Sequence, residues 1–399
     1  MKRRLVILTE IISPYRIPLF NALMQEEGID PYVIFLSETD PALRQWRVYK
    51  EEIRFPYCVL PSWRRRVGEY NALLNRGLSR ALRSATPDMM LCGGYSYVAS
   101  WQALAWAKSH HVPFFLWSES VIQDRRNGHA VVEFLKNQFL RKCDGFVVPG
   151  TSAREYLLAQ GIKEKAIFAA PNAVDNDFFG QAAAVVRRDA DTKRSELSLP
   201  ERYFLFVGRL VREKGVLALL AAYAKLDAET RRKVGLAFVG EGKARHELEV
   251  QARSISPGVV RFAGFVHREQ LAAYYALADA LVLPTQTDTW GLVVNEAMAC
   301  SLPVIVSPVA GCATDLIREH WNGMLVSAGD VPSLSSAMQS LASQPDLLAS
   351  MGAHSREHIR QYSPEDWSAG LARALESAAG RADDSNGLPK ARRWDDQRD

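Results

Sequence analysis

The sequence is poor in cysteine, and its few cysteines form no recognisable pattern. The 399-residue chain holds five, an odd number, and no two lie in a Cys-x-x-Cys spacing. Disulfide-rich folds and structural zinc sites need paired or clustered cysteines, so neither is expected here. A reducing, cytoplasmic environment fits this pattern best. The five are Cys58, Cys92, Cys143, Cys300 and Cys312.

Long apolar runs are missing as well. The longest uncharged apolar stretch, residues 216–224, is far shorter than the roughly 18 residues of a membrane span. The N-terminus places basic residues before an apolar run, as a signal peptide does, but Glu10 ends that run and no small-residue cleavage site follows. We therefore expect a strand at the N-terminus and no segment that crosses a membrane.

An excess of charge of one sign is also absent. The formal net charge is +4, which is too small to indicate nucleic acid as a partner. With 48% hydrophobic and 24% charged residues, the composition is typical of a soluble globular protein. A chain of 399 residues exceeds what one hydrophobic core usually organises, so two domains are expected.

What is present is a repeated alternation of short apolar runs with helical patterns. This alternation predicts an α/β fold with parallel sheets covered by helices on both faces. Two such series occur, so we predict two doubly wound, Rossmann-like halves. The expected strands are 5–9, 32–36, 89–92, 114–117, 146–148 and 166–170 in the first series, and 203–207, 236–239, 260–262, 280–283 and 304–307 in the second.

The domain boundaries follow from the same pattern. Residues 1–180 form the expected first domain and residues 201–361 the second, with 181–200, which lacks a strand pattern, as the connection. A C-terminal helix around 362–380 is expected to return to the first domain. Residues 381–399 are charged and rich in turn formers, and we expect them to be disordered.

The first chemical motif follows the expected strand 203–207. It reads Gly208-Arg209-Leu210, then Lys214-Gly215 at the start of a helix. Glycine lets the backbone approach a ligand, and a helix start offers free N–H groups, so two cations beside it suit a diphosphate. The alternative is an arginine and a lysine solvated on a surface loop.

The second motif runs from a strand end at Pro284 into a helix that begins near Leu292. Asp288 lies in the loop and Glu296 about one turn into the helix, so both carboxylates face one ligand. A carboxylate holds sugar or ribose hydroxyls, and the amides of 291–293 suit phosphate. In the alternative, Asp288 caps the helix and Glu296 is a surface residue.

Together these motifs resemble glycosyltransferase family 4, whose members have the two-domain GT-B fold with the active site in the interdomain cleft. The resemblance is carried by FVGRLVREKG, FVGEG, RFAGFV, DTWGLVVNEAMA, LPVIVSPVAG and NGMLV in the second half. In the first half it is looser and rests on SPYRIPLF from Ser13 and on PNAVD at 171–175.

The resemblance implies a retaining glycosyltransferase that moves a sugar from a UDP- or GDP-sugar to a glycan or lipid-linked acceptor, in cell-surface polysaccharide or glycolipid synthesis. Arg209 and Lys214 then bind the pyrophosphate and stabilise the leaving group, while Glu296 holds the ribose. Asp288 takes the position of an acid that contacts the donor sugar and is more often Glu in the family. A front-face reaction without a side-chain nucleophile is implied. The other implied donor-binding residues are Gly208, Phe265, Val266, Gly291, Leu292 and Val293.

No metal or other cofactor is expected. Asp175-Asn-Asp177 and Asp189-Ala-Asp191 imitate the Asp-x-Asp of metal-dependent transferases, but the first lies in the turn between the domains and the second in the connection. The cations of the first motif would then neutralise the phosphates.

The acceptor is expected on the first domain. Tyr15, Arg16, Tyr95 and Glu119 follow expected strands, and ligands bind outside the carboxyl ends of parallel strands. Packing or capping roles are the alternative for each.

Residues 63–83 carry six arginines against one acid, with apolar residues at helical spacing. They predict an amphipathic helix that rests on an anionic membrane, which would place the protein peripherally on the cytoplasmic face. An ordinary helix that covers a sheet is the alternative. Two other functions stay open at this stage: a nucleotide-sugar epimerase and a non-catalytic sugar-nucleotide binder.

Overall fold

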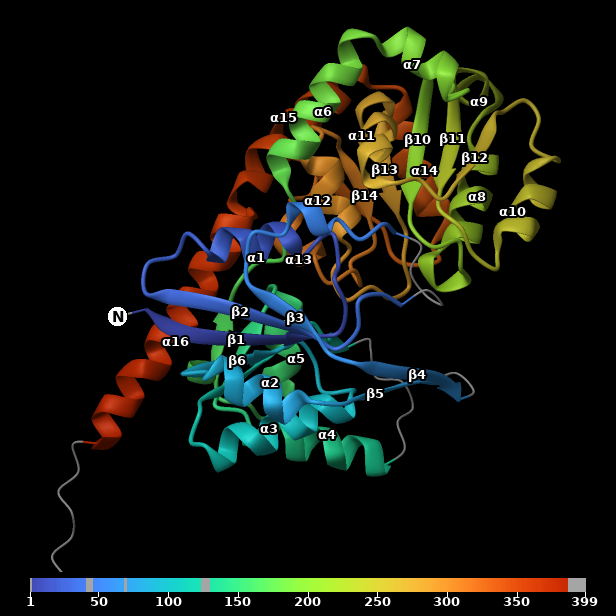
Figure 1. The fold of residues 1–399 in the computed structure, drawn as a ribbon. Coiled ribbons are helices and arrows are strands. Elements are labelled where there is room, and N and C mark those ends of the chain that lie inside the picture. The colour runs from blue at the N-terminus through green and yellow to red at the C-terminus, as the bar shows by residue number, and fades with distance from the viewer. Residues whose placement is uncertain (1, 41–45, 68–69, 123–129, 387–399) are drawn as a thin grey trace, which may run out of the picture.

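The chain folds around two parallel β-sheets, each covered by helices. The computed structural model describes residues 2–40, 46–67, 70–122 and 130–386. Figure 1 shows the two halves one above the other, with the N-terminal half below. The predicted fold class, GT-B with two Rossmann-like halves, is confirmed by this arrangement.

The first sheet has seven strands in the order β3-β2-β1-β6-β7-β8-β9. Most are continuous apolar runs buried on both faces, which is why they form a parallel sheet between helices. The edge strand β3 was not predicted, because it is only three half-buried residues long. The strands are β1 (Arg3–Thr9), β2 (Ile29–Phe35), β3 (Tyr57–Val59), β6 (Met89–Cys92), β7 (Phe114–Trp117), β8 (Gly145–Val148) and β9 (Ile167–Ala169).

The second sheet has six strands in the order β12-β11-β10-β13-β14-β15. All neighbouring pairs are parallel, and the short edge strand β15 is again one that the sequence pattern missed. The strands are β10 (Arg202–Val207), β11 (Val234–Val239), β12 (Val260–Gly264), β13 (Ala280–Leu283), β14 (Val304–Val306) and β15 (Gly323–Leu325).

Helices cover both sheets. Those of the first half are α1 (Ile17–Leu23), α2 (Leu78–Ala85), α3 (Val98–Ser109), α4 (Ala130–Lys142) and α5 (Thr151–Ala159). Those of the second half are α8 (Val216–Lys225), α9 (Ala228–Lys233), α10 (Arg245–Ala252), α11 (Arg268–Leu277), α12 (Leu292–Ala299), α13 (Ala313–Leu316), α14 (Val331–Ala342) and α15 (Pro345–His358).

The last helix, α16 (Pro364–Asn386), leaves the second half and lies along the first (Figure 1). It packs against α1, β8 and β9, and its Trp367 and Leu371 enter the core of the first half beside Phe20. The expectation that residues from 381 onward are disordered was wrong for 381–386, which form the end of α16. The rest of that tail lies outside the described residues.

Residues 181–200, predicted as a connection without strands, are mostly helical. They belong to α6 (Asn176–Arg188) and α7 (Ala190–Glu196). Asp175 caps α6 by accepting a hydrogen bond from the amide of Phe178, and Phe179 and Ala183 bury one face of the helix. The connection is therefore a structured element that packs against α11 and α12.

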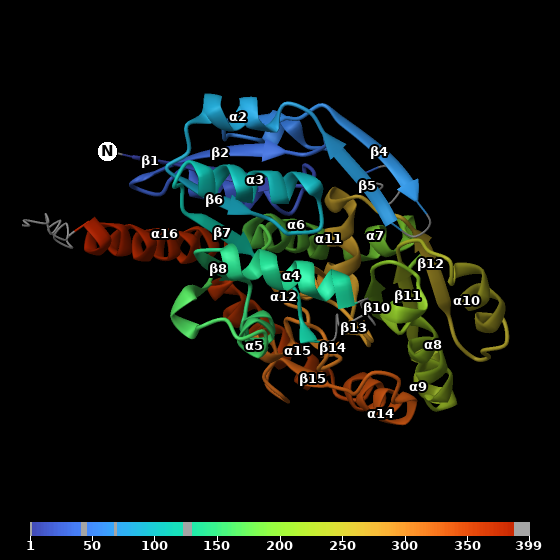
Figure 2. The ribbon, with the colours of Figure 1, turned by 90° about the horizontal axis from the view of Figure 1, so that it is seen from below.

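The amphipathic helix predicted over residues 63–83 was wrong. This stretch forms an antiparallel hairpin, β4 (Ser62–Val67) and β5 (Tyr70–Asn75), and α2 starts only at Leu78. The side chains alternate with period two, since Leu73 is buried whereas Trp63 and its cross-strand partner Leu74 are exposed. That alternation overrides the helical spacing of the apolar residues. Figure 2 shows the hairpin reaching beyond the first sheet.

Candidate functional site

The loop after β10 brings a lysine to the carboxyl edge of the second sheet. A short 3₁₀ turn, Arg212–Lys214, ends at Gly215, which has a positive φ of 71°. A Cβ at Gly215 would lie 2.0 Å from the carbonyl oxygen of Pro284. Only glycine allows this approach, and it places Lys214 beside the loop that follows β13.

Lys214 and Asp288 meet there as an ion pair. The Lys214 Nζ lies 2.6 Å from Asp288 Oδ2 and 3.3 Å from the carbonyl oxygen of Thr287. Their side chains are only 16% and 18% exposed, so solvent weakens this pair less than a surface pair. Two of the four residues predicted to act in catalysis are therefore in direct contact. Arg209 follows β10 on the same edge, and it is exposed.

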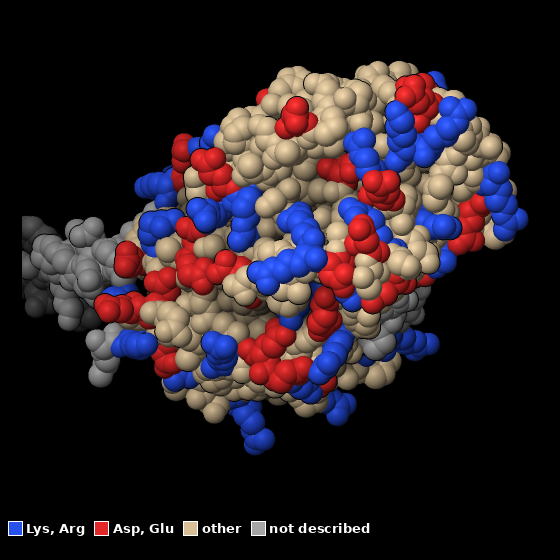
Figure 3. Space-filling model, turned by 90° about the horizontal axis from the view of Figure 1, so that it is seen from above, with Lys and Arg blue, Asp and Glu red and all other residues tan. Residues whose placement is uncertain are grey.

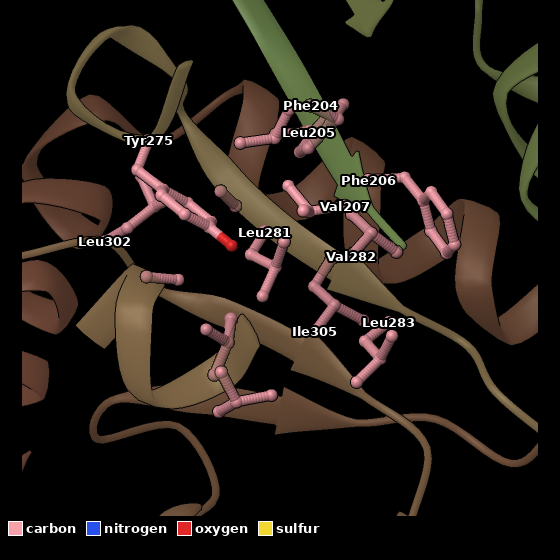
Figure 4. Packing of buried hydrophobic residues seen from close by; sticks show 14 of the residues in the cluster. Phe204, Leu205, Phe206, Val207, Tyr275, Leu281, Val282, Leu283, Leu302 and Ile305 are labelled. Carbon is pink, nitrogen blue, oxygen red and sulfur yellow. The ribbon is translucent and has the colours of Figure 1, made fainter. Parts of the chain in front are cut away.

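Glu296, the second predicted acid, is fully buried on α12. Tyr275 of α11 donates a hydrogen bond to Glu296 Oε2 at 2.6 Å, whereas Oε1 has no hydrogen bond of normal geometry among the described residues. Figure 4 shows the Tyr275 hydroxyl pointing inward among the buried side chains around Leu281. A buried carboxylate needs hydroxyl donors around it, and Tyr275 and Tyr15 both act on Glu296 in this way.

Burial raises the pKa of Glu296 from 4.5 to about 7. Loss of hydration disfavours the charged form. The hydrogen bond from Tyr275, the positive charge of Arg268 and the hydroxyl of Tyr15 act in the opposite direction. Tyr15 belongs to the first half of the chain, so the predicted donor acid and a predicted acceptor residue lie close together across the junction.

The N-terminus of α12 lies between the two predicted acids. Gly291 precedes it with a φ of 98°, and no side chain caps the helix. The amides of Leu292 and Val293 in the first turn therefore have no partner within the helix, which suits an anion.

Across the sheet, Gly264 turns the chain after β12. The exposed ring of Phe265, which precedes Val266, makes an edge contact with His267.

On the first half, three side chains form a polar group at the carboxyl ends of β1, β7 and β9. Arg16 lies over the ring of Trp117 at 3.8 Å, and its Nη2 donates to Glu119 Oε1 at 3.3 Å. The Nδ2 of Asn172 donates to the same oxygen at 3.1 Å. The structure therefore brings the predicted residues Arg16 and Glu119 together.

Tyr95 is placed differently from the other predicted acceptor residues. Its ring packs against Phe139, 6.0 Å between centroids, at the core of the first half. Burial raises the pKa of its hydroxyl to about 12. This environment matches the packing role that was the alternative for this residue.

Sequence reasoning missed a set of contacts between the two halves. Tyr49 donates to Glu269 Oε2 at 3.0 Å, and Arg268 forms an ion pair with Glu52. The Arg268 guanidinium also lies 4.4 Å from the Tyr49 ring and 4.8 Å from that of Phe178. Residues 49–52 show no strand or helix periodicity, so no signal in the sequence marked them.

The described residues show neither a metal-binding cluster nor a membrane-spanning helix. They contain no group of three or more His, Cys, Asp or Glu side chains arranged to hold a metal ion. In the same part of the chain, no helix is both long and apolar enough to span a membrane.

Two family models match adjoining parts of the chain. Residues 187–363 match the model described as glycosyl transferases group 1, and residues 20–178 match the model described as Glycosyltransferase Family 4. The chain belongs to this family of GT-B glycosyltransferases.

Two curated relatives show how far the similarity extends. D-inositol 3-phosphate glycosyltransferase 2 of Catenulispora acidiphila is 34% identical over 192 residues, which cover 45% of this chain and 44% of the relative. Alpha-D-kanosaminyltransferase of Streptomyces kanamyceticus is 33% identical over 171 residues, covering 40% and 43%. The chain thus spans about half the length of the curated relatives it matches.

Solved structures resemble the whole chain. The HepE protein of Anabaena in complex with UDP and glucose has a TM-score of 0.73 at 15% identity, covering 94% of this chain and all of that one. Sucrose-phosphate synthase from Thermosynechococcus elongatus has a TM-score of 0.69 at 20% identity, covering 95% and 100%. At these identities the likeness establishes the fold alone.

Proposed function

We propose that the protein is a retaining glycosyltransferase that transfers a sugar from a UDP- or GDP-sugar to an acceptor. The observation that carries the proposal is the meeting of Lys214 and Asp288 at 2.6 Å beside the open N-terminus of α12. A fixed cation and free amides at one sheet edge suit a diphosphate, and a neighbouring carboxylate suits sugar hydroxyls. The names of the curated relatives are consistent with such an activity.

Each residue then has a separate task. Lys214 and Arg209 neutralise the charge that develops on the departing diphosphate, which lowers the barrier in the transition state. Glu296 accepts the ribose hydroxyls, and Asp288 accepts hydroxyls of the donor sugar. We propose that no metal takes part, because these cations and the amides of α12 supply the compensating charge.

The acceptor is proposed to bind at Arg16 and Glu119. Donors on the arginine and an acceptor oxygen on the glutamate suit a polyhydroxylated molecule, and the Trp117 ring holds the arginine in place. The curated relatives are named for inositol phosphate and aminosugar transfer, so inositol phosphates are sensible first acceptors to test. A glycan or lipid-linked acceptor of cell-surface synthesis is the broader proposal.

A peripheral membrane contact is proposed through the β4–β5 hairpin. Trp63 and Leu74 are 54% and 46% exposed on its surface, with the side chains of Arg65 and Arg76 exposed nearby. Aromatic and basic residues together favour an anionic lipid surface. The face seen from above in Figure 3 carries side chains of both signs of charge.

Flotation with anionic vesicles tests the membrane contact. Wild-type protein should float with phosphatidylglycerol vesicles at low salt and less at high salt. The variant Trp63→Ala should stay at the bottom, whereas Val185→Ala, which shortens an apolar side chain on α6 that is also more than half exposed, should float normally. Wild-type protein that fails to float at low salt contradicts the contact.

A labelled donor panel tests the activity itself. We expect incubation with UDP-glucose, UDP-N-acetylglucosamine or GDP-mannose and an acceptor mixture to release nucleotide and label an acceptor. An epimerised donor would instead indicate an epimerase, and binding without turnover would indicate a non-catalytic binder. Either of these results contradicts the proposal.

A further inference from the structure

A continuous series of polar contacts crosses the junction between the two halves. At one end lie Arg16 and Glu119 on the acceptor side, and at the other Asp288 and Lys214 on the donor side. The residues in the middle of this series have no assigned role in the proposed sugar transfer.

Asn172 forms the link on the first half. It lies in the turn after β9 and is only 5% exposed. Its side-chain Nδ2 donates to Glu119 Oε1 at 3.1 Å, and its backbone oxygen accepts from Asn295 Nδ2 at 3.0 Å. One residue thereby contacts the acceptor carboxylate and the donor helix α12 at the same time.

Asn295 continues the series into the donor loop. It is fully buried, and its Oδ1 accepts a hydrogen bond from the Trp290 indole at 2.9 Å. The backbone amide of Trp290 lies 3.4 Å from Asp288 Oδ1, and the other oxygen of Asp288 holds Lys214. Both polar atoms of the Asn295 side chain, Oδ1 and Nδ2, therefore make hydrogen bonds along this path.

The surrounding packing fixes the series in place. A Cβ at Gly150 of the first half would lie 2.8 Å from the Trp290 ring and 2.4 Å from Asp315 Oδ2. Asp315 in turn accepts hydrogen bonds from the amide and hydroxyl of Thr151. Because the two halves approach this closely, a shift of Trp290 would also disturb the domain contact.

We propose that Asn172 and Asn295 are positioning residues that hold Glu119 in register with the Asp288–Lys214 pair across the domain junction. The inference rests on the proposed function, since it assigns how the acceptor and donor groups of that site are aligned. Hydrogen bonds tolerate little change in length or angle, and small misplacements of reacting groups reduce rates strongly. Neither asparagine touches the reacting atoms.

The variant Asn295→Leu tests the proposal, because leucine keeps the shape of asparagine but makes neither hydrogen bond. Calorimetry with UDP and GDP should give dissociation constants within about twofold of wild type. Turnover of UDP-glucose or GDP-mannose should show an unchanged donor KM, but a kcat for nucleotide release that is lower by about tenfold. Rates are referred to the concentration of nucleotide-binding sites, so partial unfolding does not imitate the effect.

Asn322→Leu is the matched control. Asn322 is also fully buried, accepts from the Arg318 amide at 2.8 Å and donates to the Leu316 oxygen at 2.8 Å, but it lies off the path. It should lose thermal stability as Asn295→Leu does and yet keep the wild-type kcat.

Asn172→Ala provides a second, independent measurement. It removes the bond to Glu119 and leaves the backbone oxygen that Asn295 uses. If both residues act through Glu119, the double variant should lose less kcat than the product of the single effects.

Each contrary result has a distinct meaning. The positioning role is refuted if the kcat of Asn295→Leu equals that of Asn322→Leu. It is also refuted if the effects of Asn295→Leu and Asn172→Ala on kcat multiply in the double variant. In either case the proposed function stands. If wild-type protein turns over no nucleotide sugar, the proposed function fails and this role fails with it.

Discussion

Glu296 makes the stability of the protein depend on pH in a way that can be calculated. Burial raises its pKa from 4.5 to about 7, so between these values the folded protein holds a proton that the unfolded chain has released. Stability must then fall as pH rises through this range and level off above it. At ~1.4 kcal/mol for each pH unit, the loss between pH 5 and pH 8 is about 2 to 3 kcal/mol.

The variant Glu296→Gln isolates this effect. Glutamine keeps an oxygen for the Tyr275 hydroxyl but does not titrate. The free energy of unfolding of wild type relative to the variant should therefore fall by about 2 to 3 kcal/mol from pH 5 to pH 8. Urea unfolding of both proteins at each pH, with Glu229→Gln on the exposed helix α9 as control, measures the difference.

The reasoning fails if the difference between wild type and Glu296→Gln stays within ~0.5 kcal/mol across that range. A fall of similar size in the comparison of wild type with Glu229→Gln would also refute it, because an exposed carboxyl should contribute little. The same titration has a consequence for binding. Ribose hydroxyls donate more strongly to a carboxylate than to a carboxylic acid, so UDP or GDP affinity should rise from pH 6 to pH 8.

Three further substitutions test other parts of the site. Lys214→Ala should weaken UDP or GDP binding by about tenfold or more in calorimetry, whereas Arg212→Ala, whose side chain is 71% exposed, should bind almost as wild type does. Asp288→Glu lengthens the acid by one methylene and should change the preferred donor sugar in a turnover panel while leaving the affinity for free nucleotide unaltered; an unchanged preference contradicts its assigned contact. Gly215→Ala should lower the melting temperature far more than Gly329→Ala, since a Cβ at Gly215 meets a backbone oxygen at 2.0 Å and one at Gly329 meets nothing within 4 Å, although both have positive φ. Equal losses in the two variants would refute that steric account.

The sheets could be predicted from the sequence because their strands are short apolar runs with little competing signal. Phe114–Trp117 and Met89–Cys92 were placed to the residue. The edge strands β3 and β15 were not, since strands of only three residues give no distinct periodicity. The hairpin formed by β4 and β5 was mistaken for a helix because its apolar residues also fit a helical spacing. Its cross-strand pairs, such as Trp63 with Leu74, join residues whose pairing no local pattern indicates.

The position of the donor-site residues could be predicted from the sequence, but their contacts and burial could not. The motifs placed Lys214 and Asp288 at one sheet edge, yet their direct contact depends on the sharp turn at Gly215. The burial of Glu296 was not foreseen, because it comes from Tyr275 on another helix and from Tyr15 on the other half of the chain. Contacts of this kind join residues far apart in sequence, so local sequence patterns do not predict them.

The most direct test of the account is a single turnover product analysis. Wild-type protein is incubated with anomerically labelled UDP- and GDP-sugars and an acceptor mixture that includes inositol phosphates, and the products are examined by mass spectrometry and NMR. We predict release of the nucleotide diphosphate and a new glycoside with the anomeric configuration of the donor, both lost in Lys214→Ala. An inverted product, an epimerised donor or equal product from Lys214→Ala would contradict the assignment of a retaining donor site at the carboxyl edge of the second sheet.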